Sequence, residues 1–163
     1  MPTLRPWQPA DWPHFLALDV ETAIESLGEA TEPERTLLRE RHPGRLADRG
    51  FTPARFAAPG AQLWVLEGEG QRYLGHLWLT DKLDRLTGAR ILEVSTMGLV
   101  SGSRGKGLGR VLMQKAEDEA RAREIEVIEL SVAGNNRRAR ELYKDLGYET
   151  TRRQMRRRLH PKL

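Results

Sequence analysis

The chain has 163 residues, 39% of them hydrophobic and 31% charged, a mixture typical of one soluble globular domain. Its formal net charge of +4 admits a nucleic acid, an anionic membrane or a phosphorylated ligand, and charge alone does not choose among them. The absence of cysteine excludes disulfides, thiolate metal sites and a covalent thiol intermediate, and no apolar run is long enough to cross a membrane.

The first predicted elements are a short strand and a helix. Residues 3–5 form the strand, which the prolines that follow it stop. Asp11 is the predicted N-cap of the helix, and Pro13 stands in its first turn, where helices accept proline. An imperfect helical stripe of apolar residues then continues until Gly28 ends the helix.

A capping box predicts the start of a second helix. Thr31 and Glu34 have the Thr-x-x-Glu spacing of this motif, and the apolar residues behind them carry the helix to about Arg41. Residues 42–60 are rich in proline and glycine and predict no clear element.

The pattern then changes from helices to strands. Residues 62–66 and 73–79 predict the two strands of a hairpin, with a glycine-containing turn at 68–70. After a polar turn, residues 91–100 predict the next strand.

The last part of the chain alternates helices and strands. Residues 108–123 predict a helix, 124–132 a strand, and 148–159 a final strand. Between these strands lies a short helix that Asn136 begins and Gly147 ends. The order β-α-α-β-β-β-α-β-α-β predicts a single sheet with helices on its faces.

A glycine-rich loop joins the strand at 91–100 to the helix at 108–123. Gly105, Gly107 and Gly109 leave no side chains where the chain turns into the helix, so main-chain amides can converge there. A helix N-terminus with free amides and a positive dipole end is a natural binding site for phosphate. A flexible turn that binds nothing is the alternative, because glycines alone do not identify a ligand.

The spacing of these glycines excludes two familiar phosphate-binding motifs. A P-loop would need a lysine after the second glycine, but Gly102 counts forward to Gly107 followed by Leu108. The dinucleotide fingerprint Gly-x-Gly-x-x-Gly fails because its third glycine position, counted from Gly105, is Arg110. The strand before the loop also follows a hairpin, which argues against a Rossmann domain.

Two motifs together resemble a known family. The loop Arg104-Gly105-Lys106-Gly107-Leu108-Gly109 resembles the Gln/Arg-x-x-Gly-x-Gly/Ala signature of the GCN5-related N-acetyltransferases, the GNAT superfamily. Residues 136–148, Asn-Arg-Arg-Ala-Arg-Glu-Leu-Tyr-Lys-Asp-Leu-Gly-Tyr, are similar to the second motif of that superfamily, Asn-x-x-Ala-x-x-Leu-Tyr-x-x-x-Gly-Phe/Tyr. The order of the motifs and the helix and strand between them also match.

The resemblance implies the fold and its division into halves. We expect one α+β domain over residues 1–163, with a mixed, mostly antiparallel sheet of six to seven strands flanked by about four helices. Residues 91–159 would form the half that binds acetyl-coenzyme A. Residues 1–90 would build the acceptor side, where the likeness is only topological.

The same resemblance implies how the cofactor is bound. Main-chain groups near Met97 and Leu99 would hold the pantetheine arm in a gap between two splayed strands. Asn136 matches a position that often contacts this arm, although simple N-capping of the last helix explains it equally well. The pyrophosphate would be held by Arg104, Gly105, Lys106, Gly107, Leu108 and Gly109.

Direct acetyl transfer also needs an acid and a base. Tyr143 is the candidate acid for the departing thiolate, and filling the apolar stripe of its helix is the alternative. Glu93 is the candidate base, acting through a water molecule, because an unpaired carboxylate in an apolar strand tends to have a raised pKa. A structural salt bridge or an exposed edge is its alternative. His76 is a second candidate base, or a histidine that packs in the sheet.

We therefore expect an N-acetyltransferase that moves the acetyl group from acetyl-coenzyme A to a primary amine by direct attack in a ternary complex. A non-catalytic coenzyme A sensor on the same fold, or a small basic nucleic-acid-binding protein, is the alternative. The acceptor would be a small-molecule or peptide amine. We expect no metal, nucleic acid or membrane to be involved, and the sequence leaves a homodimer possible. The first residues lack the apolar core of a signal peptide, so we expect a cytoplasmic protein.

Two charged stretches carry further expectations. Residues 19–34 contain six carboxylates and no lysine or arginine, which could steer a cationic amine or simply form a solvated helix. The arginines between positions 152 and 158 favour a protected sheet edge or terminus over nucleic-acid binding, because no aromatic residues interleave with them.

Overall fold

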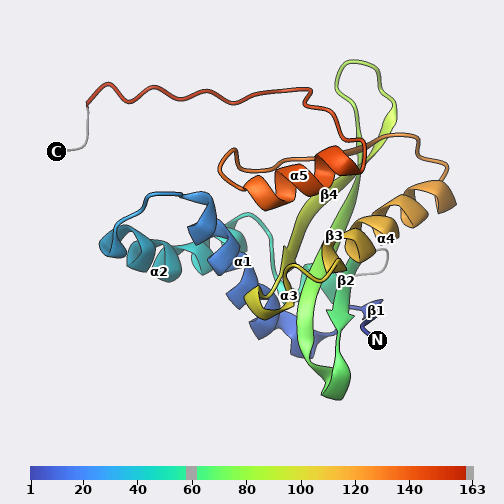
Figure 1. Ribbon diagram of the computed structural model, residues 1–163, viewed down its shortest axis with the longest axis horizontal. Helices are drawn as coiled ribbons and strands as arrows, with labels where there is room; N and C mark the ends of the chain where they lie inside the picture. Colours follow the sequence, from blue (N-terminus) through green and yellow to red (C-terminus); the bar gives the residue numbers. More distant parts are fainter. Residues whose placement is uncertain (58–61, 161–163) are drawn as a thin grey trace.

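The computed structural model describes residues 1–57 and 62–160 and contains one five-stranded sheet (Figure 1). Its strands follow one another across the sheet in chain order. They pair antiparallel, except for the parallel pair at one edge formed by the last two strands. The strands are β1 (Thr3–Pro6), β2 (Gln62–Glu67), β3 (Tyr73–Leu83), β4 (Arg90–Leu99) and β5 (Ile128–Leu130).

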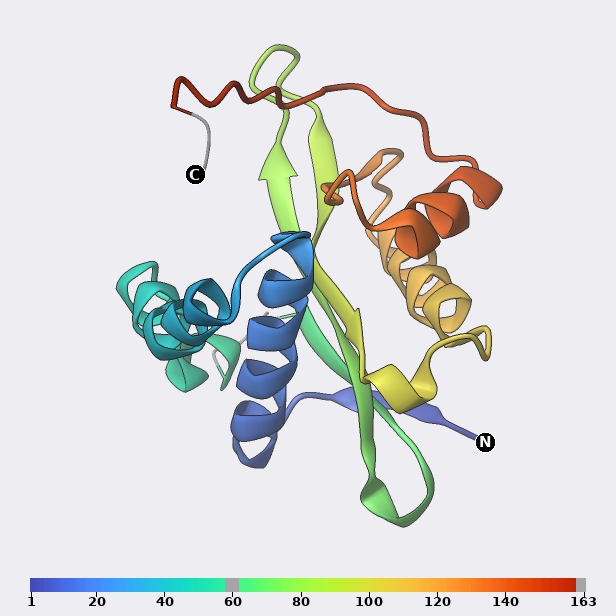
Figure 2. The same cartoon turned by 60° about the vertical axis from the view of Figure 1, so that its left-hand side comes forward.

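Helices cover both faces of this sheet. The three helices of the N-terminal part lie on one side and the two of the C-terminal part on the other, with the strands between them (Figure 2). Each face has its own apolar cluster. The helices are α1 (Trp12–Ser26), α2 (Glu32–Asp48), α3 (Pro53–Ala57), α4 (Leu108–Ala122) and α5 (Arg137–Asp145).

The α+β class and the mixed, mostly antiparallel sheet are confirmed, with small differences in number. The described residues form five strands rather than six or seven, and five α-helices rather than about four. The hairpin β2–β3 is confirmed, and so are the helices α1, α4 and α5. The predicted strand at 124–132 is reduced to the three residues of β5.

The helices begin where the sequence predicts, but α2 extends further than expected and the residue before α1 does not cap it. The Thr31 hydroxyl accepts a hydrogen bond from the Glu34 amide at 3.3 Å, which confirms the capping box of α2. This helix does not stop near Arg41 and runs through Pro43, because Leu46 is buried and anchors its last turns. Burial of an apolar side chain here outweighs the local preference of proline.

Asp11 precedes α1 as expected, but it does not cap the helix. Its carboxylate instead accepts hydrogen bonds from the Gln8 amide at 2.7 Å and from both terminal nitrogens of Arg5 at 2.8 Å. The Arg5 guanidinium helps to lower the pKa of this buried carboxyl, against the desolvation that raises it. The Asp11 carboxylate therefore binds Arg5 of β1 rather than the free amides at the start of α1.

The predicted final strand is wrong. Residues 148–160 pair with no described strand, and the segment leaves the body of the protein as an extended arm (Figures 1 and 2). Tyr148 still packs against the apolar cluster, but the larger apolar side chains beyond it, Met155 and Leu159, are 92% and 76% exposed. A segment with five arginines and so little apolar surface gains little from packing on the sheet.

Candidate functional site

The loop between β4 and α4 provides free main-chain amides at one point. Gly105 and Gly107 have φ angles of +74° and +76°, a left-handed conformation that favours glycine. Gly107 is the N-cap of α4, whose first turn leaves its amides without partners inside the helix. No described residue accepts a hydrogen bond from the amides of Gly105, Lys106 or Gly107. The local structure is therefore a ready cradle for an anion.

The third glycine of the loop has a different role. A Cβ atom on Gly109 would lie only 2.9 Å from the Leu142 side chain of α5. A side chain here would have to displace the end of the Leu142 side chain, so glycine allows this contact between α4 and α5. The start of α4, and with it the cradle, thus lies against a residue of the second motif.

Next to the cradle, the edge pair of strands separates. Pairing between β4 and β5 covers only residues 92–94 and 128–130. Beyond Val94, residues 95–99 of β4 have no described strand neighbour on that side. The splay that the resemblance implies is present in the structure.

A β-bulge decides which amides face this gap. The register between β3 and β4 shifts so that Ser95 is an extra residue in β4. Before the bulge, the Leu92 amide donates toward β5, to the Val127 carbonyl at 3.0 Å. After it, the Val100 amide donates toward β3, to Leu74 at 2.9 Å.

Because main-chain groups alternate sides along a strand, the Val100 bond fixes the direction of the residues before it. Met97 and Leu99 consequently direct their amides away from β3, to the side where β5 is missing. These are the two residues whose main-chain groups the sequence predicts to hold the pantetheine arm.

Tyr143 of α5 lies against the same gap. It is 9% exposed and belongs to the apolar cluster that also contains Met97 and Leu99. Its hydroxyl forms no hydrogen bond with a described residue, and its ring meets that of Tyr148 edge-on at 5.8 Å. Burial raises the pKa of Tyr143 to about 12, so the phenol keeps its proton at neutral pH.

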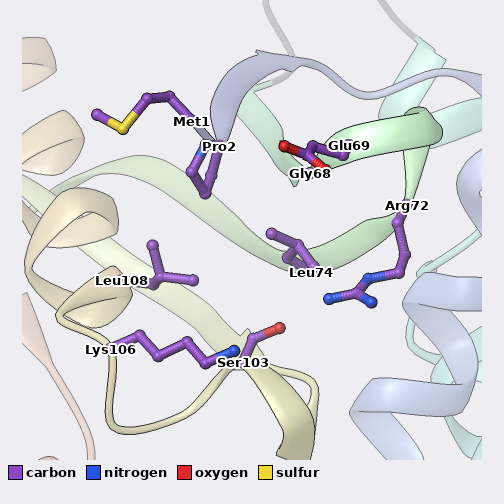
Figure 3. A pocket seen from close by; sticks show the side chains of 9 residues that line it. All are labelled: Met1, Pro2, Gly68, Glu69, Arg72, Leu74, Ser103, Lys106 and Leu108. Atoms are coloured by element: carbon purple, nitrogen blue, oxygen red, sulfur yellow. The ribbon is translucent and has the colours of Figure 1, made fainter.

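The charged side chains of the loop do not converge on the cradle. Arg104 donates to the Leu99 carbonyl at 3.2 Å and forms an ion pair with Glu25 of α1 at 3.0 Å. Lys106 instead lines a pocket on the other side of the loop, as Figure 3 shows. The cradle itself is thus made of main-chain groups.

Asn136 performs the capping role that was one of its two readings. Its side-chain oxygen accepts a hydrogen bond from the Ala139 amide at 3.2 Å, at the start of α5. Its side-chain nitrogen makes no hydrogen bond with the described residues and points to no protein partner. A cofactor contact through that nitrogen is therefore compatible with the cap.

Glu93 does not have the apolar, unpaired environment that the sequence suggested. Its side chain is 38% exposed, and its carboxylate accepts a hydrogen bond from Lys82 of β3 at 2.6 Å. This bond raises the pKa of the Lys82 ammonium, which also lies 3.8 Å from Glu129. The salt-bridge alternative describes this geometry, and a base at Glu93 would have to work beside an ammonium.

His76 has the environment of a packing residue. It is 1% exposed, its Nδ1 is hydrogen-bonded to the Tyr73 hydroxyl at 2.5 Å, and its ring lies 4.5 Å from that of Phe15. Desolvation lowers the pKa of His76 to about 3, so the ring is neutral at physiological pH. This burial favours the packing alternative over a base that exchanges protons with solvent.

The structure brings together three residues that the sequence did not single out. Asp19 of α1 contacts His42 of α2 at 2.8 Å and accepts a hydrogen bond from Thr96 of β4 at 3.4 Å. The His42 and Asp19 side chains are 19% and 17% exposed, so solvent can reach them. Thr96 directly precedes Met97, which places this group on the opposite sheet face from Tyr143.

No sequence signal marked these three residues as a group. His42 stands in the stretch with no predicted element, and Asp19 was one of several carboxylates. The acidic stretch of α1 is also less free than its composition suggested. Besides Asp19, Glu21 pairs with Arg39 at 3.6 Å.

The described residues offer neither a metal site nor a membrane-spanning helix. Within residues 1–57 and 62–160, no group of acidic and histidine side chains is placed to hold a metal ion. None of the helices in these ranges is both long and apolar enough to span a membrane.

Comparisons with known proteins agree with this geometry. A mycothiol acetyltransferase of Beutenbergia cavernae is 39% identical over 87 residues, which are 53% of this chain and 28% of that protein. An uncharacterised N-acetyltransferase of Bacillus subtilis, YdgE, is 31% identical over 96 residues, 59% of this chain and 60% of that one. The chain thus spans less than two thirds of either relative.

Solved structures share the fold. A GCN5-related N-acetyltransferase from Ralstonia eutropha superposes with a TM-score of 0.74 at 20% identity, covering 98% of this chain and 100% of the other. A protein of Clostridium acetobutylicum, called a predicted acetyltransferase and solved with acetyl-CoA, superposes at 0.61 with 19% identity, covering 98% and 97%.

The family model that matches the sequence spans residues 23–148, which include both motifs, the cradle and the strand gap. With the fold and the motifs in agreement, this chain belongs to the acetyltransferase (GNAT) family.

Proposed function

We propose that this chain transfers the acetyl group of acetyl-coenzyme A to a primary amine by direct attack within a ternary complex. One observation carries the proposal: the cradle of free amides is followed by a strand gap toward which Met97 and Leu99 direct main-chain amides that have no strand partner. The cradle suits the diphosphate of coenzyme A, and the strand gap suits its flexible arm, which carries amide groups. We further propose that residues 1–163 act as one domain, with residues 1–90 on the acceptor side and 91–159 on the cofactor side.

Binding would use main-chain groups more than side chains. The amides of residues 105–109 would hold the pyrophosphate, since they have no protein partner and lie at the positive end of α4. Met97 and Leu99 would pair with the pantetheine arm as a missing strand would. Arg104 would keep its bond to the Leu99 carbonyl and add positive charge beside the cradle.

The transfer step forms one bond and breaks one. The nitrogen lone pair of the amine attacks the thioester carbon, the C–N bond forms, and the C–S bond breaks to release a thiolate. An amide at Leu99 or Met97 stabilises the negative charge on the carbonyl oxygen. Tyr143 donates its phenolic proton to the thiolate, a role for which its hydroxyl is free of protein partners. The proton that the attacking nitrogen loses as the amide forms returns through water to the phenolate, so that Tyr143 ends the step neutral.

The amine must lose its extra proton to a base before it attacks. Glu93, acting through a water molecule, is the base proposed from the sequence, and its bond to Lys82 is the main argument against it. His42, held by Asp19 beside β4, is the alternative that the structure offers. Glu93 alternates with Leu92 and Val94 of the α4–α5 cluster and so lies on the opposite face of the sheet, the face on which Asp19 of α1 contacts Thr96.

A coenzyme A sensor without catalysis is the second candidate, and the Glu93–Lys82 pair favours it because it occupies the expected base. Calorimetry with acetyl-coenzyme A, followed by thiol release over a panel of amines, separates the two functions. We expect binding and release with at least one amine. Binding without release would support the sensor, and absence of binding would refute both.

The cradle itself can be tested with a matched pair of variants. Gly107→Glu places bulk and negative charge at the N-cap of α4, so we expect cofactor binding to be lost. Gly88→Glu adds the same side chain to the turn between β3 and β4, at a φ angle of +71° that brings similar backbone strain. The control should keep wild-type affinity for acetyl-coenzyme A.

A further inference from the structure

A pocket of about 420 Å³ lies on the side of the loop away from the strand gap. Its walls come from the start of the chain, the tip of the β2–β3 hairpin and the turn that leads into α4 (Figure 3). The hairpin lies on the β3 side of β4, whereas the gap lies on the β5 side. The pocket is therefore separate from the place where the pantetheine arm is proposed to bind.

One buried hydroxyl in this pocket has no partner. Ser103 is 2% exposed, and its Oγ forms no hydrogen bond with any described residue. A buried polar group without a hydrogen bond costs roughly 1–3 kcal/mol, so such groups in native proteins call for an explanation. In Figure 3 the Ser103 hydroxyl points into the pocket, toward the side on which the Arg72 guanidinium lies.

Two cations in the same pocket also lack a counter-charge. Arg72 of the hairpin and Lys106 of the loop form no ion pair with a described residue. Figure 3 shows the ends of both side chains directed toward Ser103 from opposite sides. Glu69, the acidic residue of the wall, lies at the other end of the pocket in this view.

We propose that this pocket binds a phosphate monoester that is separate from the acetyl donor. The arginine fork, the ammonium and the hydroxyl supply donors from three directions, which suits the oxygens of a tetrahedral phosphate. Leu74 and Leu108 line the remaining wall and offer an apolar surface to the organic part of the ligand. The proposal does not depend on acetyl transfer, because the site uses neither Tyr143 nor the strand gap.

Calorimetry of the full chain with phenyl phosphate tests the binding, and phenol and inorganic phosphate are the comparison ligands. We expect one molecule of phenyl phosphate per chain, weaker binding of inorganic phosphate, and none of phenol. Arg72→Ala should weaken phenyl phosphate about tenfold or more, as loss of a charge-assisted bond predicts. Arg85→Ala, in the turn between β3 and β4, is the matched control and should leave the affinity unchanged.

Ser103→Ala gives a second readout that a purely structural serine would not give. We expect weaker binding of phenyl phosphate together with an unchanged or higher melting temperature without ligand, because the variant removes an unsatisfied hydroxyl. A lower melting temperature with unchanged affinity would contradict the role of Ser103.

Titration of phenyl phosphate into protein saturated with coenzyme A tests whether the site is separate. We expect its affinity to persist, and Arg72→Ala to leave coenzyme A binding intact. Absence of phenyl phosphate binding, or an equal loss in Arg85→Ala, would overturn the proposal. Displacement of phenyl phosphate by coenzyme A would also overturn it. So would a loss of affinity in Arg72→Ala for coenzyme A but not for 3′-dephospho-coenzyme A, because the pocket would then bind the 3′-phosphate of the cofactor.

Discussion

Replacing Tyr143 by phenylalanine should separate catalysis from stability. The hydroxyl makes no hydrogen bond with a described residue, and the ring packs in the apolar cluster of α4 and α5. Its removal therefore leaves no orphaned partner, and we expect the free energy of unfolding to change by no more than about 0.5 kcal/mol. A general acid contributes roughly 10²–10⁴ to the rate, which corresponds to about 2.7–5.4 kcal/mol of activation free energy.

The assay is thiol release at saturating acetyl-coenzyme A and amine, with calorimetry for cofactor affinity. We expect turnover to fall at least about a hundredfold while affinity and melting temperature stay at their wild-type values. Tyr148→Phe is the matched control, because burial also raises the pKa of that phenol to about 12 and its ring contacts Tyr143. The control should retain wild-type turnover.

Three results would refute the reasoning. Unchanged turnover in Tyr143→Phe would mean that water or another group protonates the thiolate. An equal loss in Tyr148→Phe would point to the packing of the two rings rather than to the acid. A parallel loss of cofactor affinity would assign Tyr143 to binding.

The other predictions concern the cradle, the base and the buried histidine. Gly107→Glu should lose acetyl-coenzyme A binding in calorimetry while Gly88→Glu retains it. If Glu93 is the base, Glu93→Gln should lower turnover most at neutral pH. The difference from the wild type should shrink as pH rises, because more of the amine is then already deprotonated. The same pH profile in His42→Gln, and not in Glu93→Gln, would assign the base to His42. His76 has a pKa lowered to about 3 in the folded chain, so the unfolded chain binds its proton first as pH falls below about 6.5. Wild-type stability in urea should therefore fall by up to about 1.4 kcal/mol per pH unit toward pH 3 relative to His76→Phe, and parallel curves would contradict the assignment.

The loop before α4 and the two ends of α5 were predictable because their signals are local. The capping oxygen of Asn136 and the left-handed Gly147 that ends α5 follow from rules that act within one helical turn. The positive φ angles of Gly105 and Gly107 likewise follow from how the chain must turn into α4. Such features need no knowledge of distant residues.

What the sequence did not predict depends on contacts between distant positions. Glu93 meets Lys82 across the β3–β4 hairpin, and this pairing removes the unpaired carboxylate that the strand pattern suggested. Asp19 and His42 meet only because α1 and α2 pack side by side. The C-terminal segment has the alternation of a strand, but alternation alone does not supply apolar surface to bury.

The extra residue Ser95 gives β4 a phase. With it, odd-numbered residues after the bulge point their amides at the gap; a strand of the same length that ran regularly, without the bulge, would present the even-numbered amides there. Ser95 therefore lets one strand direct the even-numbered Leu92 to β5 before the bulge and the odd-numbered Met97 and Leu99 to the same side after it, so that a change of sequence phase keeps one continuous edge of amides.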